Sequence, residues 1–362
     1  MNETVSSKAA ERFVSLDAYR GAVMISLVSH GFGFSALDGH SLFGFLARQT
    51  EHVAWEGCVY WDLIQPAFMF IVGVAMPFAY AKRRSLGQRH GKILGHVIKR
   101  SIYLFLIAAL FTSIHSGRPR ITFVNVLPQI AIGYFLAFFV LKRSYSVQGL
   151  TAASILILYT LVWVFYPGNG DAGPWATGNV NIGSDFDKWL MGDYYTGYYV
   201  GMNAIPSTAT IIAGVMCGQL IASSLPQKRI MLILAISGIA TMLAGLALSP
   251  LVPVVKRIWT ASFGLYSAGW VILSLLLFYW VIEVLGYRRW TLIFVVVGMN
   301  SIAAYVIFQL FRGWIDNAVL TFSRPLVEAM GAYGTVLQAF LVLGVIWCIL
   351  YFFYRRKIFF KV

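Results

Sequence analysis

The chain has 362 residues, of which 59% are hydrophobic and 12% are charged, and its formal net charge is +14. A soluble domain usually carries about 25% charged residues, so the composition excludes an ordinary soluble enzyme. Apolar runs of about 18 residues or more recur along the whole length. The sequence therefore predicts an all-α, polytopic membrane protein, because only helices or closed barrels satisfy the backbone in lipid.

Ten membrane-spanning helices are predicted, each close to the ~20 residues that a bilayer requires. In chain order they cover residues 18–36, 58–80, 97–114, 123–141, 147–166, 203–222, 230–249, 260–284, 291–310 and 334–354. Residues 1–15 are expected to form a cytoplasmic tail, and residues 16–362 a single membrane domain.

The basic residues predict the orientation of these helices. Of the 28 Lys and Arg residues, 19 fall in one alternating set of connecting segments and eight in the other, and Arg20 lies inside the first span. Cytoplasmic loops carry the excess of Lys and Arg, so both termini are expected in the cytoplasm of a multi-pass inner-membrane protein. The same asymmetry explains the net charge without a nucleic-acid partner.

The first span begins with two opposite charges in RFVSLDAYRGAVM. Asp17 and Arg20 are three residues apart, which places them on one helix face as an ion pair. The pair either locks the helix end or contributes to an anion site. His30 lies ten residues beyond Arg20, about 15 Å further along a helix, and is either a hydrogen-bonded structural residue or a reactive one.

Titratable side chains cluster before the second span, in TEHVAWEGCVYWDLIQPAF. His52 is placed near the outer membrane surface, where a histidine can exchange protons near neutral pH, and Glu56 or Asp62 would orient its ring. The alternative is a surface histidine in a polar loop. Pro66 follows Asp62 by four residues and predicts a kinked helix with a polar lining.

The longest loop is expected on the extracytoplasmic side, at about residues 167–202. It is rich in Gly, Asn, Asp, Trp and Tyr, which suits stacking against sugar rings but is also typical of an aromatic belt with turns. The three cysteines, Cys58, Cys217 and Cys348, have no metal-type spacing, so no metal site is predicted.

Four segments resemble one family. RFVSLDAYRGAVMISLVSHGFG, HVAWEGCVYWDLIQPAFMFIVGVAMPF, VPVVKRIWTASFGLYSAGW and GMNSIAAYV resemble the heparan-alpha-glucosaminide N-acetyltransferase family, in order over about residues 12–310. The resemblance implies a transmembrane enzyme that moves an acetyl group from cytoplasmic acetyl-CoA to an extracytoplasmic amino sugar. It also implies that His52 is catalytic and that Arg12, Asp17 and Arg20 lie near the coenzyme.

Three positions depart from the family pattern. His30 stands where human-type members have an asparagine with a proposed catalytic role, so His30 is a second catalytic candidate. Gln129 replaces an arginine expected near the coenzyme, and Phe308 replaces a histidine. Gln129 joins the expected coenzyme-binding residues, together with Ser207 and Asn300, although such polar residues often serve only as hydrogen bonds between helices.

Two functions stay open from the sequence. The first is acetyl transfer, in which His52 acts either as a general base or as an acetyl-carrying nucleophile. In this hypothesis the coenzyme threads through the helix bundle between two ends that lie about 30 Å apart. The second is a transporter or flippase for a saccharide or a lipid, without chemistry. Membrane lipids are expected partners in both cases, and a homodimer is compatible with the sequence.

Overall fold

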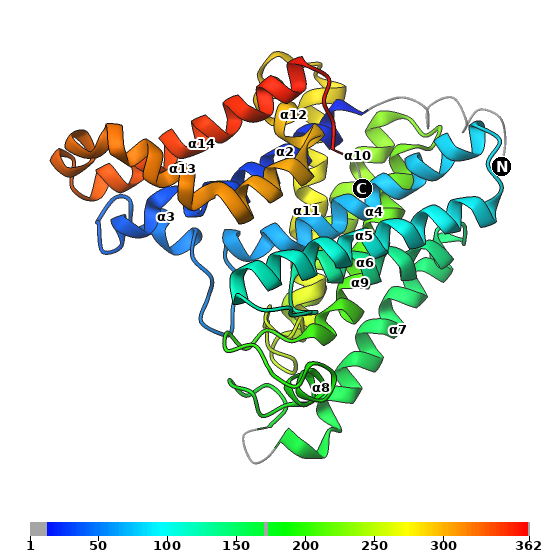
Figure 1. Ribbon diagram of the computed structural model, residues 1–362. Helices are drawn as coiled ribbons and strands as arrows, with labels where there is room; N and C mark the ends of the chain where they lie inside the picture. The colour runs from blue at the N-terminus through cyan, green and yellow to red at the C-terminus, as the bar shows by residue number, and fades with distance from the viewer. Residues whose placement is uncertain (1–12, 170–172, 361–362) are drawn as a thin grey trace. The chain divides into compact units, whose positions relative to one another are not determined.

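The structure is a computed structural model that describes residues 13–169 and 173–360 (Figure 1). The described chain is built from helices, with one isolated β-bridge between Glu56 and Val255. It divides into two compact units. Unit 1 contains Ala54–Gly57 and Gln65–Leu276, and unit 2 contains Phe13–Val53, Cys58–Ile64 and the chain from Leu277 onward.

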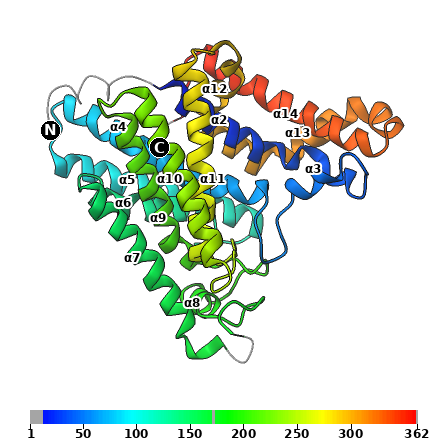
Figure 2. The same cartoon turned by 180° about the vertical axis from the view of Figure 1, so that it is seen from behind.

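Unit 1 is a helical bundle. Its helices are α4 (Ile64–Ser85), α5 (His90–Ser116), α6 (Val126–Val140), α7 (Tyr145–Val164), α8 (Ile182–Met191), α9 (Ala204–Ile221), α10 (Gln227–Leu248) and α11 (Ala261–Tyr279). Figure 2 shows α9, α10 and α11 side by side. Helix α9 forms the centre of this unit, because 78% of its apolar window is buried.

Small residues allow α4 and α9 to cross closely. A Cβ atom on Gly73 would lie 2.0 Å from the Ile211 carbonyl oxygen, and one on Gly214 would lie 2.1 Å from the Phe70 carbonyl oxygen. Backbones that approach this closely leave room only for glycine, and such contacts are a usual way of packing helices in membranes. The crossing therefore depends on glycine in both helices.

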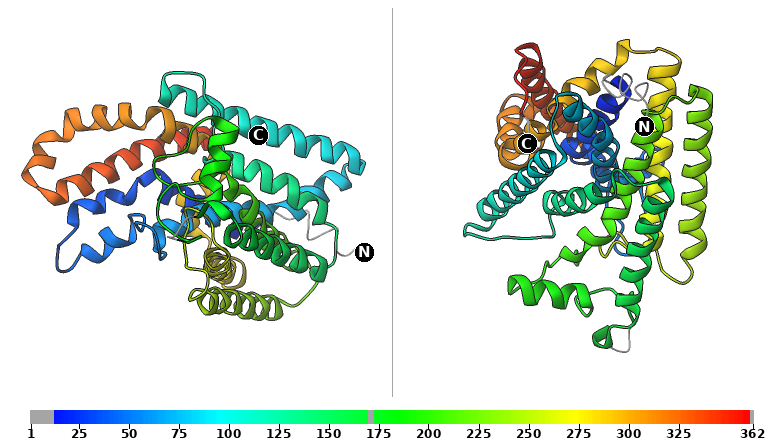
Figure 3. Two further views of the ribbon diagram at one scale, coloured as in Figure 1. Left: turned by 90° about the horizontal axis from the view of Figure 1, so that it is seen from below. Right: turned by 90° about the vertical axis from the view of Figure 1, so that its right-hand side faces the viewer.

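Unit 2 is built around α2 (Val14–Ser29), α12 (Leu292–Met299), α13 (Ser301–Ala329) and α14 (Ala332–Arg355), with the short helix α3 (Gly44–Gln49). Helices α13 and α14 form an antiparallel hairpin, drawn in orange and red in Figure 3. Helix α2 packs closely on α12, where a Cβ atom on Gly298 would lie 2.0 Å from the Asp17 carbonyl oxygen. This contact places Asp17 beside the end of α12.

All ten predicted spans fall on helices, and in the described part of the chain seven helices are long and apolar enough to cross a membrane. An eighth results if α12 with its preceding turn and α13 count as one span bent by 65°. The first and fourth predicted spans contain α2 and α6, which have 16 and 15 residues and are shorter than the ~20 that a crossing needs. The fold is an integral, multi-pass helical membrane protein.

Three details of the predicted helices were wrong. The first span ends at Ser29 rather than at residue 36. The predicted span 291–310 bends at Asn300, and its second arm runs on to Ala329. The prediction of a kink at Pro66 was also wrong. Helix α4 begins at Ile64, so Pro66 lies in the first turn, where the missing N–H of proline breaks no helical hydrogen bond.

Candidate active site

Helix α2 ends abruptly at the predicted outer side of the membrane. His30 adopts a left-handed conformation (φ 52°) and its N–H donates to the Leu27 carbonyl, while Phe32 also has a positive φ of 55°. A positive φ costs free energy in residues that have a Cβ atom, so backbone strain is concentrated at this helix end. Strained backbone of this kind is common at functional sites.

Arg312 of α13 caps the same helix end. Its Nη1 donates to the Val28 carbonyl oxygen at 2.8 Å, and its guanidinium lies 5.8 Å from the centre of the Phe308 ring. The His30 ring is 6.2 Å from that ring. A cation near the last carbonyls of a helix satisfies groups that have no partner within the helix and favours the negative end of its dipole. Arg312 therefore stabilises the point at which α2 stops.

The segment that carries His52 packs against this end of α2. A Cβ atom on Gly31 would lie 3.3 Å from the Thr50 carbonyl oxygen, so glycine allows the two backbones to approach. The Ser26 hydroxyl and the Tyr60 hydroxyl are hydrogen-bonded at 2.6 Å, and the Tyr60 N–H donates to Gln49 Oε1 at 3.0 Å. These contacts hold the chain on both sides of His52 close to the C-terminus of α2.

His52 and Asp62 form a close pair. His52 Nδ1 lies 2.7 Å from Asp62 Oδ1, and the other carboxyl oxygen of Asp62 accepts the Val59 N–H at 3.2 Å. Asp62 lies in a 3-10 turn, Tyr60–Leu63, that leads into α4. The Asp62 side chain is 1% exposed and the His52 side chain is 40% exposed. The carboxyl group is thus a buried, fixed partner for a histidine that solvent reaches.

The geometry selects one tautomer of His52. An ionised carboxylate only accepts hydrogen bonds, so Nδ1 carries the proton that points to Asp62. A neutral ring in this tautomer has its lone pair on Nε2. A histidine oriented by a buried carboxylate is the arrangement that general-base and nucleophilic catalysis use. Asp62, rather than Glu56, provides this contact. Glu56 belongs to unit 1, where it forms the bridge with Val255.

The predicted ion pair of α2 is confirmed. Arg20 Nη1 lies 3.6 Å from Asp17 Oδ1, and both side chains are partly buried. Glu283 accepts the Ser15 N–H at 2.9 Å and an Arg288 N–H at 3.0 Å, so the N-terminus of α2 is capped by a carboxylate from another part of unit 2. The rise along α2 from Arg20 to the level of His30 is about 15 Å, half of the bilayer core.

Asn300 follows α12 and holds the C-terminal segment. Its side-chain amide donates to the Ile358 carbonyl at 3.0 Å and accepts the Phe360 N–H at 3.2 Å. It is fully buried at the bend between α12 and α13, two residues after the Gly298 that touches Asp17. The Asn300 amide thus has a structural role, because it ties the C-terminal segment to the bend. Arg12, the remaining basic candidate at this end, lies outside the described residues.

The other two coenzyme candidates belong to unit 1. Gln129 of α6 is fully buried and accepts a hydrogen bond from the side chain of Gln65. Ser207 of α9 is also fully buried and donates to the Ala204 carbonyl of its own helix at 3.2 Å. Helices α6 and α9 pack closely together. A Cβ atom on Gly133 of α6 would lie only 3.4 Å from the Thr208 hydroxyl oxygen of α9. Gln129 and Ser207 thus make hydrogen bonds of the kind that hold a packed helical bundle together.

The long loop is partly helical. It contains α8, and Asp187 on this helix accepts the Gly201 N–H at 2.8 Å. Around it lies an aromatic cluster in which Trp163 stacks on Trp175 at 6.3 Å, and Trp55 donates to the Trp175 carbonyl at 2.8 Å. The loop is therefore a folded cap of unit 1 rather than an open chain of turns.

The sequence reasoning missed two residues of the site. Arg312 was placed in a connecting segment because the predicted span stopped at residue 310. An arginine inside a long apolar helix is itself a signal, because charged side chains at membrane depth are costly and usually functional. Tyr60 left a weaker signal, since a tyrosine at a helix start is common at membrane surfaces. Within the described residues, no group of three or more His, Cys, Asp or Glu side chains is arranged to hold a metal ion.

Comparison with known proteins gives a consistent result. The family described as "Heparan-alpha-glucosaminide N-acetyltransferase, catalytic" matches residues 12–252, more than half of the chain. Heparan-alpha-glucosaminide N-acetyltransferase of Mus musculus is 22% identical over 417 residues, which cover 98% of this chain and 61% of that protein. The Homo sapiens protein of the same name is 23% identical over 415 residues, which cover 97% and 60%.

The chain thus spans about three fifths of the length of these curated relatives. The matched region contains α2, the His52–Asp62 pair and most of unit 1. The chain belongs to the heparan-alpha-glucosaminide N-acetyltransferase family.

Proposed function

We propose that the protein is a membrane-embedded acetyltransferase that moves an acetyl group from cytoplasmic acetyl-CoA to the amine of a sugar on the extracytoplasmic side. The observation that carries this proposal is the His52 Nδ1 to Asp62 Oδ1 contact of 2.7 Å, with Asp62 buried and His52 open to solvent. The family of the chain supports the same chemistry. The proposed location is the inner (cytoplasmic) membrane of a cell, and the distribution of basic residues supports cytoplasmic termini there.

In the direct route, the sugar amine attacks the thioester carbonyl carbon. His52 Nε2 takes the proton that the amine loses, the C–S bond breaks, and the proton passes to the departing thiolate. Asp62 holds the ring in the required tautomer and stabilises its positive charge while the proton is on it. The products are an N-acetylated sugar and free coenzyme A.

In the two-step route, His52 Nε2 attacks the thioester itself. An acetyl-imidazolium forms as coenzyme A leaves as a thiolate. The sugar amine then attacks the acetyl carbonyl carbon, the bond from that carbon to Nε2 breaks, and the proton that the amine loses balances the charge of the thiolate. The two routes use the same orientation of His52. They differ in whether a labelled acetyl group stays on the protein when no sugar is present.

The cytoplasmic end of the path is proposed at Asp17 and Arg20. A guanidinium pairs well with phosphate oxygens, and the phosphates of the coenzyme are far from its thioester. The rise of about 15 Å along α2 separates Arg20 from the helix end near which His52 is held. An extended coenzyme would lie along α2, with phosphates at Arg20 and its acetyl group toward His52. Asn300, in the same unit as Asp17 and Arg20, is a proposed secondary contact.

The test uses the purified full chain with labelled acetyl-CoA and glucosamine. His52→Ala should keep its affinity for acetyl-CoA and lose acetyl transfer by roughly 10²–10⁴-fold. Arg20→Ala should weaken acetyl-CoA binding in a protein that stays monodisperse. Transfer at a wild-type rate by His52→Ala would remove this histidine from the mechanism and make His30 the next candidate. No acetylated product, together with saccharide movement in vesicles, would indicate a transporter instead.

A further inference from the structure

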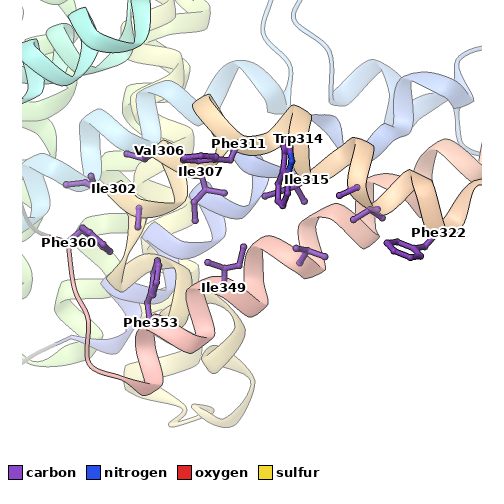
Figure 4. A pocket seen from close by; sticks show the side chains of 14 residues that line it. Ile302, Val306, Ile307, Phe311, Trp314, Ile315, Phe322, Ile349, Phe353 and Phe360 are labelled. Atoms are coloured by element: carbon purple, nitrogen blue, oxygen red, sulfur yellow. The ribbon is translucent and has the colours of Figure 1, made fainter. Parts of the chain in front are cut away.

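An apolar cavity of about 670 Å³ lies between the two helices of the α13–α14 hairpin. Fourteen residues line it, among them Val306, Phe311, Trp314, Ile349, Phe353 and Phe360. Figure 4 shows side chains of both helices directed toward the gap between them, with Phe360 of the C-terminal segment near Phe353. We call this feature the hairpin groove.

The lining of the hairpin groove selects its ligand class. None of the fourteen lining residues carries a charge, and all are aliphatic or aromatic. A coenzyme or a sugar needs convergent polar groups to replace its hydration, which this surface does not offer. A hydrocarbon chain needs only apolar contact area, which it does offer.

Three positive charges stand at one end of the hairpin groove. Arg355 ends α14, Arg356 and Lys357 follow it, and all three side chains are exposed. The Arg355 guanidinium lies 6.0 Å from the Tyr351 ring centre and the Arg356 guanidinium 5.7 Å from the Phe352 ring centre. Basic and aromatic side chains combined in this way are typical of the membrane–water interface. They adjoin Phe353, the groove residue closest to the end of α14.

The length of the groove on α14 matches one leaflet. From Val345 to Phe353 the helix rises about 12 Å, and the three basic residues follow within about one turn. One leaflet of the hydrocarbon core is about 15 Å thick, half of the ~30 Å of the bilayer. A lipid whose headgroup reached the basic residues would therefore lay its chain along the apolar wall.

We propose that the hairpin groove binds one acyl chain of an anionic phospholipid, whose phosphate pairs with Arg355, Arg356 and Lys357. Acyl contact alone would hold any phospholipid. The three positive charges add a preference for a negatively charged headgroup, which we expect to be roughly ten- to hundredfold over a zwitterionic lipid. This site is independent of acetyl transfer, and its test does not measure activity.

The experiment places the full chain in bilayer discs that contain equal amounts of phosphatidylglycerol and phosphatidylcholine. Native mass spectrometry then reports the lipids that stay bound. We expect one phosphatidylglycerol per chain. Replacing Arg355, Arg356 and Lys357 by Gln should reduce its excess over phosphatidylcholine about tenfold or more. The same change at Lys82, Arg83 and Arg84, the basic end of α4 in unit 1, is the matched control and should have no effect.

A second pair of variants tests the apolar wall. Ile349→Trp fills the hairpin groove and should reduce retention of both lipids, whereas Leu341→Trp, at an exposed position of α14 outside the groove, should not. The exposed Gln variants keep the test valid if Ile349→Trp fails to fold. Equal retention of the two lipids by the wild type would overturn the proposal. So would a lipid-free dimer, which would make a second copy of the chain the occupant.

Discussion

Asp62 is the residue on which the proposed chemistry depends most directly after His52. Its buried carboxylate accepts from the His52 ring and from the Val59 N–H. A neutral amide at this position would keep the size of the side chain and remove the charge. It could also present an N–H to the ring and so favour the wrong tautomer.

We therefore expect Asp62→Asn to reduce acetyl transfer by roughly 10²–10⁴-fold without loss of acetyl-CoA affinity. Turnover of labelled acetyl-CoA and equilibrium binding, measured on the same preparation, check both parts. Asp38→Asn is the control, because Asp38 is an exposed carboxylate of the same unit. Near wild-type turnover by Asp62→Asn would show that this carboxylate does not orient the catalytic group.

Asp187 makes a second prediction at the scale of one residue. It is fully buried in α8, and burial raises the pKa of its carboxyl group from 3.8 to about 6, against the opposing effect of the Gly201 N–H. Because the folded-state pKa is above the unfolded one, this group contributes its full stability below pH 3.8 and loses it as the pH rises through about 6.

The variant Asp187→Asn keeps an acceptor for the Gly201 N–H but cannot ionise. Above pH 6 we expect it to be more stable than the wild type by about 2–3 kcal/mol at most, and below pH 4 the difference should vanish. Thermal midpoints at pH 4 and pH 7.5 measure this. A variant that is less stable at pH 7.5 would contradict the assignment.

At the scale of elements, the crossing of α4 and α9 decides whether unit 1 packs. A methyl group at Gly214 would lie 2.1 Å from the Phe70 carbonyl oxygen, a distance that only backbone movement can relieve. Gly214→Ala should therefore destabilise the protein by about 1–3 kcal/mol. Gly149→Ala on α7 meets no atom within 4 Å and should be neutral or stabilising. Detergent melting curves of the two variants provide the comparison, and equal midpoints would argue against the close crossing.

Helix ends were the elements that periodicity predicted least well. The apolar pattern of the first span continues past residue 30, yet α2 stops at Ser29. The reason is tertiary, since Arg312 from a distant helix caps Val28 and Gly31 meets Thr50. The bend of 65° at Asn300 also has a tertiary origin. The Asn300 side chain is hydrogen-bonded to Ile358 and Phe360 of the C-terminal segment, which are 58 and 60 residues further along the chain.

At the scale of the whole molecule, the predicted orientation requires an even number of crossings. Ten predicted spans satisfy this condition. Among the described residues, seven helices are long enough to cross, or eight if the bent pair is one span, and neither count includes α2 or α6. The asymmetry of 19 against eight basic residues predicts that the end of α4 is cytoplasmic and that the loop around α8 is not.

Cysteine labelling tests this orientation in intact cells. In a background without Cys58, Cys217 and Cys348, we expect Thr177→Cys to react with a membrane-impermeant maleimide and Ser85→Cys to react only after permeabilisation. Thr177 is preferable to its neighbour Gly178, whose φ of 121° suits only glycine. Labelling of Ser85→Cys alone from outside would reverse the topology.

The sequence by itself determined the class of the protein and the position of its helices. Long apolar runs form helices in a bilayer, so each of the ten predicted spans falls on a helix of the described chain, although only seven or eight helices are long enough to cross. The i, i+3 spacing of Asp17 and Arg20 is set by the helix itself. Only the tertiary structure decided that Asp62 rather than Glu56 contacts His52. Both carboxylates are near in sequence, but the chain between them turns. A 3-10 turn carries Asp62 back to the ring, while Glu56 pairs with Val255, almost 200 residues away. Such contacts depend on how distant segments pack, which no local pattern records.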